Sequence, residues 1–62
     1  MTNADILELF TERAAAREYD GGASIGHAEN RALMDVRKIT GELPTWLVEH
    51  VERIQRERKE NG

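Results

Sequence analysis

Two glycine-containing breaks constrain the fold of this chain more than any other feature of its sequence. Gly21 and Gly22 follow Asp20 in the first break, and Gly41 stands three residues before Pro44 in the second. Glycine tolerates the left-handed conformation that ends many helices, and proline suits a first helical turn because it has no N–H to leave unpaired. The three segments between the breaks carry apolar residues at helical spacing. We therefore predict an all-α fold, a small three-helix domain with an N-terminal αα-hairpin and a third, C-terminal helix.

The expected boundaries follow from these breaks and from residues that favour helix starts. Thr2 or Asn3 can cap the first helix and Ser24 the second, because their side-chain oxygens accept bonds from free backbone N–H groups. A chain of 62 residues is one domain at most, so residues 1–62 are expected to form a single helical domain. The expected elements are helices at about residues 3–19, 25–40 and 45–58, followed by a frayed tail at residues 59–62.

Each expected helix carries one apolar face, and the three faces together supply the core. The first face consists of Ile6, Leu7, Phe10 and Ala14. The second consists of Ile25, Ala28, Ala32, Val36 and Ile39, with Leu33 at its edge. The third consists of Trp46, Leu47, Val51 and Ile54, with His50 on the same side. We expect the small alanines to let the first two helices approach closely, with Trp46 lying across the pair.

A few apolar residues do not fit a single internal face. Leu9, Met34 and Val48 fall outside the expected core stripes, and a homodimer that buries a second apolar face would account for them. Trp46 belongs to the aromatic class that often forms the energetic centre of an interface. The candidate protein-interaction residues are therefore Leu9, Met34, Trp46 and Val48.

The charge balance disfavours nucleic acid as the main partner. Twelve acids against nine bases give a net charge of −3, whereas nucleic-acid affinity usually rests on a basic face that displaces counterions. On the third helix the bases alternate with acids, and Glu49–Arg53 and Glu52–Arg56 are expected as solvated i,i+4 pairs. A nucleic-acid surface remains the alternative, and its candidate residues are Arg31, Arg37, Lys38, Arg53 and Arg56.

No arrangement in the sequence indicates catalysis, a metal or a cofactor. The chain has no cysteine, and its two histidines, His27 and His50, lack the spacing of known zinc motifs. The glycine doublet lacks the preceding strand and the lysine of a phosphate-binding loop. Glu18 and Asp20 are close in sequence, but a chain of this size offers little concavity to raise a carboxyl pKa. We therefore predict a protein that is not an enzyme.

The sequence also gives an expectation about compartment. No stretch approaches the run of about 18–20 apolar residues that a membrane span requires. The first residues, MTNADILELF, carry acids and lack the basic region that opens a signal peptide. A cytoplasmic protein with no membrane partner is expected.

The segment ERAAAREYDGGASIGHAENRALMDV, residues 12–36, resembles a helical hairpin module of phage and plasmid replication or primase-type proteins, and it covers about two fifths of the chain. The positions that carry the resemblance are Glu12, Arg13, Ala14, Ala15, Glu18, Tyr19, Asp20, Gly21, Gly22, Ser24, Ala28, Glu29 and Ala32. The chain departs from the module at Ala16 and Ala23, where large aliphatic residues are usual. It also departs at His27, where an acid usually completes a capping box with Ser24.

The resemblance implies an origin in a mobile element and a small accessory role, without a specific activity. Together with the surplus apolar residues, it predicts a non-enzymatic protein–protein interaction module. Such a module would modulate or inhibit host or replication machinery, as a monomer or a homodimer. The alternative is a small helical nucleic-acid-binding regulator that uses the basic residues of the second and third helices.

Overall fold

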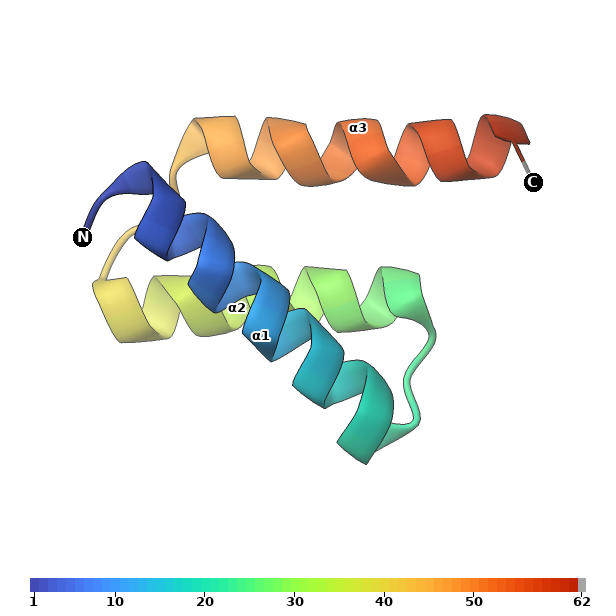
Figure 1. Cartoon of the computed structure of the whole chain (residues 1–62), viewed down its shortest axis with the longest axis horizontal. Helices are drawn as coiled ribbons and strands as arrows, with labels where there is room; N and C mark the ends of the chain where they lie inside the picture. Colours follow the sequence, from blue (N-terminus) through green and yellow to red (C-terminus); the bar gives the residue numbers. More distant parts are fainter. Residues whose placement is uncertain (62) are drawn as a thin grey trace.

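The computed structural model describes residues 1–61, and within that range the chain forms three helices and no strand. They are α1 (Asn3–Gly21), α2 (Ile25–Thr40) and α3 (Thr45–Asn61). α1 crosses α2 obliquely, and α3 runs alongside α2 in the opposite direction (Figure 1). The predicted all-α, three-helix architecture is confirmed. None of the helices in the described range combines the length and the apolar character needed to cross a membrane.

The boundaries of α1 are set by a capping box and a left-handed glycine. The backbone N–H of Asp5 donates to Thr2 Oγ1 at 3.1 Å, and the N–H of Thr2 donates to the Asp5 carboxylate at 3.2 Å. At the other end, Gly22 has φ of 64°, which is the left-handed conformation that stops the helix. The helix therefore extends to Gly21, two residues beyond the predicted end. Of the two adjacent glycines, only Gly22 takes the left-handed conformation.

The ends of α2 and α3 follow the predicted breaks with two differences. Gly41 closes α2 with φ of 83°, and its N–H donates to the carbonyl of Arg37. Ser24 occupies the cap position of α2, but its side chain makes no capping hydrogen bond. The backbone of α3 stays helical to Asn61, where the sequence predicted an end at residue 58. The extra turn follows Arg58, which is anchored on α2 through Glu29, and it consists largely of good helix formers. Residue 62, the last of the predicted tail, lies outside the described residues.

The core is small and forms where all three helices converge. Its buried residues come from every helix and are Phe10, Ala32, Val36, Leu47 and Val51. The molecule extends only 15 Å along its shortest axis, little more than the diameter of about 10–12 Å of one helix with its side chains. Few side chains can therefore be enclosed on all sides.

The apolar stripe of α2 is shorter than predicted. Ala28, Ala32 and Val36 are fully buried, whereas Ile25 and Ile39 are 42% and 58% exposed. The expectation that both isoleucines belong to the core is wrong, because α1 crosses α2 at an angle and covers only the middle of that helix (Figure 1). The alanines allow the close approach of α1 and α2, as expected, and α3 keeps its backbone farther from both.

Candidate functional site

Asp35 is a buried acid on α2 that joins α2 to α1. Its carboxylate accepts hydrogen bonds from Arg17 at 2.7 and 3.1 Å and from Arg13 at 3.2 Å. The hydrogen bonds from Arg17 lower the pKa of Asp35 below its ordinary value, with Arg13 adding to the effect and burial opposing it. Two arginines of α1 are thus committed to one acid of α2.

Glu29 is the second buried acid of α2, and it joins α2 to α3. Arg58 donates to both carboxylate oxygens, at 3.0 and 3.1 Å, and Gln55 donates to one of them at 3.3 Å. The hydrogen bonds from Arg58 lower the pKa of Glu29 despite its burial. Within residues 1–61, no buried side-chain nitrogen or oxygen lacks a hydrogen-bond partner. Both acids of α2 therefore lie inside the bundle and are fully satisfied.

The sequence reasoning missed these inter-helix pairs. Glu29 and Asp35 lie three residues before and after Ala32, which is the centre of the buried stripe, so their spacing could have shown that they border the core. The predicted pairs Glu49–Arg53 and Glu52–Arg56 do not form in the described part of the chain. The ion pairs of this bundle connect different helices and do not run along one helix.

An open groove of about 290 Å³ lies between the three helices, on the side where α1 diverges from α3 (Figure 1). Its walls and floor are mainly apolar. α1 contributes Leu7, Phe10, Thr11, Ala14, Ala15 and Glu18, α2 contributes Ile25 and Glu29, and α3 contributes His50 and Ile54. Because Glu29 is already bound by Arg58, the floor of the groove carries no unpaired charge.

On the α1 side, the groove is bordered in part by the short side chains of Ala14 and Ala15. A helix backbone can approach such a surface closely, and Ile25 offers exposed apolar surface on the floor. The expectation that Ile54 belongs to the core is wrong, because it is half-buried and lines the groove with Ile25. Their position at the ends of the apolar stripes, where the helices no longer converge, is the signal that could have identified them as groove residues.

The outer face of α2, which consists of Arg31, Met34, Arg37 and Lys38, is exposed along its whole length. These residues recur at helical spacing on the side opposite the buried stripe. Since Glu29 and Asp35 are inside the bundle, the only charges on this face are positive. Met34 is 51% exposed in the middle of the face.

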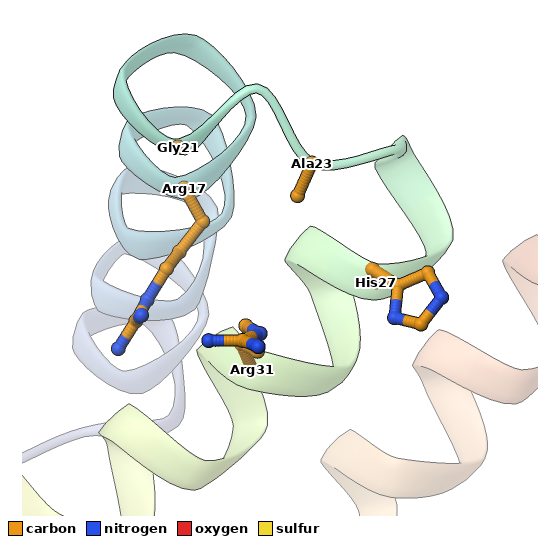
Figure 2. A pocket seen from close by; sticks show the side chains of 5 residues that line it. All are labelled: Arg17, Gly21, Ala23, His27 and Arg31. Carbon is orange, nitrogen blue, oxygen red and sulfur yellow. The ribbon is translucent and has the colours of Figure 1, made fainter.

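A smaller hollow of about 210 Å³ lies at the corner of the hairpin and is lined by Arg17, Gly21, Ala23, His27 and Arg31. Arg31 extends from α2 toward α1, whereas His27 points away from α1 (Figure 2). Arg17 is already bound to Asp35, so the hollow offers one uncommitted guanidinium. In the described range, no three potential metal-ligand side chains come together.

The structure does not bring the four candidate protein-interaction residues to one exposed surface. Leu9 and Trp46 are half-buried and pack against the core, and Val48 is half-buried on α3. Met34 alone of the four is exposed, on the outer face of α2.

The five candidate nucleic-acid residues are all exposed, and they divide between two helices. Arg31, Arg37 and Lys38 share the outer face of α2, whereas Arg53 and Arg56 belong to α3. Arg53 follows the groove residue His50 by three positions, so it borders the groove and not the outer face of α2.

Comparison of the chain with known protein families, with curated proteins and with solved structures finds no match. The function is therefore inferred from the residues of the groove and of the outer face of α2.

Proposed function

We propose that this chain is a small non-enzymatic protein-interaction module that holds an amphipathic helix of a partner protein in the groove between α1, α2 and α3. The observation that carries the proposal is the groove itself, a mainly apolar concavity of about 290 Å³ with an exposed isoleucine in its floor. Exposed apolar surface bordered by polar residues is typical of docking sites, and a helix in a groove is a recurring mode of recognition.

The state of the buried acids supports a role without catalysis. Asp35 and Glu29 are the acids most enclosed by the fold, and arginines occupy both carboxylates. Their lowered pKa keeps them ionised and paired, which suits a structural link between helices better than proton transfer.

The hairpin at residues 12–36 supports an accessory role of the kind found in phage and plasmid proteins. In that setting the partner would belong to host or replication machinery, and the chain would act as a modulator or an inhibitor in the cytoplasm. A homodimer is the other form in which the same apolar surface would be covered.

The first test combines light scattering over a range of protein concentrations with capture of a partner from a host lysate. A strict monomer that retains no partner would overturn the proposal. For a captured partner, the dissociation constant is then measured by calorimetry against two variants, Ile25→Gln and Ile39→Gln. Both isoleucines are exposed on α2, but Ile25 lines the groove and Ile39 does not.

We expect Ile25→Gln to weaken binding by about tenfold, because a docked helix would cover part of this side chain. Ile39→Gln should leave the dissociation constant unchanged. If the two variants weaken binding equally, the partner does not occupy the groove.

A second candidate function, nucleic-acid binding, rests on the outer face of α2. Arg31, Arg37 and Lys38 lie on this face without an exposed acid from the same helix. Binding to a DNA duplex would be measured at about 0.05 M and 0.2 M salt, since phosphate contacts weaken steeply with salt. The double variant Arg31→Gln/Lys38→Gln should lower the affinity more than Arg53→Gln/Arg56→Gln. Absence of binding at the lower salt concentration would exclude this function.

A further inference from the structure

The charge that α1 presents to solvent is mainly negative. Its two arginines, Arg13 and Arg17, both bind Asp35 on α2. The acids of α1 have exposed side chains, and none of them forms a salt bridge with an arginine or lysine in the described range. They are Asp5, Glu8, Glu12, Glu18 and Asp20, of which Glu18 lies near enough to Arg58 of α3 to help raise the pKa of Arg58. Because Arg13 and Arg17 both bind Asp35, the exposed charges of α1 are mostly negative, which the sequence of α1 alone does not show.

Part of this negative charge lies along the groove. Glu18 lines the groove directly, and Glu8 and Glu12 precede the lining residues Thr11 and Ala15 by three positions each. Residues three apart are neighbours on a helix surface, so these glutamates border one side of the α1 wall. Arg13 and Arg17 border its other side, where both bind Asp35. We call Glu8, Glu12 and Glu18 the acidic rim.

The opposite wall has no comparable positive charge. On α3, Arg53 and Glu57 follow the lining residues His50 and Ile54 by three positions, and their charges oppose each other. Arg58 is bound to Glu29, and its charge also attracts Glu18 across the groove. The groove therefore combines an apolar floor with a rim of net negative charge.

We propose that the occupant of the groove is a basic amphipathic helix of a partner protein, with an apolar stripe against the floor and lysines or arginines against the acidic rim. This inference rests on the proposed function, and it adds the chemistry of the partner. The α1 wall extends from Leu7 to Glu18, which corresponds to about 16 Å along the helix axis, or about three turns. Ala14 and Ala15 leave room for the partner's backbone to approach, so leucine-sized side chains can reach Ile25 and Ile54.

The experiment uses the full chain and two synthetic peptides of about 14 residues, which span about 20 Å as helices. Both peptides carry the same leucine stripe, and the flanking positions are lysine in one peptide and glutamate in the other. The two peptides have the same length, and circular dichroism verifies that their helicity is equal, so that a difference in binding reflects charge. Dissociation constants are measured by calorimetry at about 0.05 M and 0.5 M salt.

We expect the lysine-flanked peptide to bind about tenfold more tightly than the glutamate-flanked peptide at low salt, with the difference shrinking at high salt. Ile25→Gln should weaken the binding of both peptides. Glu8→Gln/Glu12→Gln should reduce the preference for lysine. The matched control Glu42→Gln/Glu52→Gln changes the net charge equally and should keep that preference, because neither residue lines the groove and Glu52 lies two positions before Ile54, on another side of α3.

The outcomes separate this inference from the proposed function. Equal binding of both peptides would overturn the charge inference alone, and the groove would remain a docking site. Binding of neither peptide would overturn both. If the wild-type chain self-associates in light scattering and Ile25→Gln abolishes the self-association, the occupant is a second copy of this chain and the inference of a separate partner is wrong.

Discussion

The two ends of this bundle are built from the same three helices, yet one is closed by apolar packing and the other is open. At the closed end, Val36 of α2 packs with Leu47 and Val51 of α3, and Phe10 of α1 completes this core at the point where the groove begins. At the open end, α1 diverges from α3 (Figure 1). The groove lies there, and Ile25 is one of its lining residues.

The ends also differ in what holds α3 in place. The closed end uses apolar burial, whereas the open end uses Arg58 and Gln55, which both reach Glu29 on α2. A polar link fixes the position of a helix without filling the volume around it. The open end can therefore keep exposed apolar surface beside an ordered helix, which is the combination that a docking site requires.

Of the substitutions considered, Phe10→Ala should lower the free energy of unfolding most. Phe10 is 5% exposed and belongs to the buried core cluster, so Phe10→Ala leaves a cavity where the three helices converge. We expect the free energy of unfolding to fall by about 3–5 kcal/mol, which is enough to unfold a domain of this size. Chemical denaturation followed by circular dichroism measures it. A loss below about 1 kcal/mol would mean that the closed end is not the stabilising region.

Substituting each buried acid shows how much its link between helices contributes to the free energy of unfolding. Asp35→Asn weakens the contacts of two arginines between α1 and α2, and we expect it to cost about 1–3 kcal/mol of unfolding free energy. Glu29→Gln acts only on the link to α3 and should cost less. Hydrogen exchange should then increase mainly in the last two turns of α3. A larger loss for Glu29→Gln would show that α3 is held chiefly by its polar link.

The pH dependence of stability tests both links at once. The folded-state pKa values of Asp35 and Glu29 lie below their ordinary values, so the unfolded chain binds protons more readily than the folded chain. Their contribution is fully present above the unfolded pKa values of about 4 and is lost as the pH falls through the lower folded values. We expect the denaturation midpoint to drop between about pH 5 and pH 2. The midpoint should drop less in Asp35→Asn than in the wild type. An equal drop in both proteins would mean that other carboxylates cause it.

Local rules predicted the corners of this fold and the central core residues, whereas the exposure of Ile39 and the groove depend on tertiary geometry. The sequence identifies Gly41 as the end of α2, whereas it leaves Thr2 or Asn3 open as the first cap and Gly21 or Gly22 open as the left-handed residue. The burial of Glu29 depends on Arg58, which lies 29 residues away, and no local rule contains that partner. Ile25 is apolar at the right spacing for the core, and only the oblique crossing of α1 leaves it exposed.

Two glycines at opposite ends of α2 give the smallest contrast. Gly41 at the closed end has φ of 83°, so alanine there is strained, and Gly41→Ala should cost about 1 kcal/mol. Gly26 lies in the first turn of α2 at the open end, and a Cβ there would meet nothing within 4 Å. Gly26→Ala should therefore stabilise the protein by about 0.5 kcal/mol, because alanine restricts the unfolded chain and favours the helix. Denaturation of both variants under one set of conditions measures the contrast. A neutral Gly26→Ala would mean that the start of α2, where Ser24 makes no side-chain cap, is frayed in solution, and the floor of the groove would then be less ordered than the rest of α2.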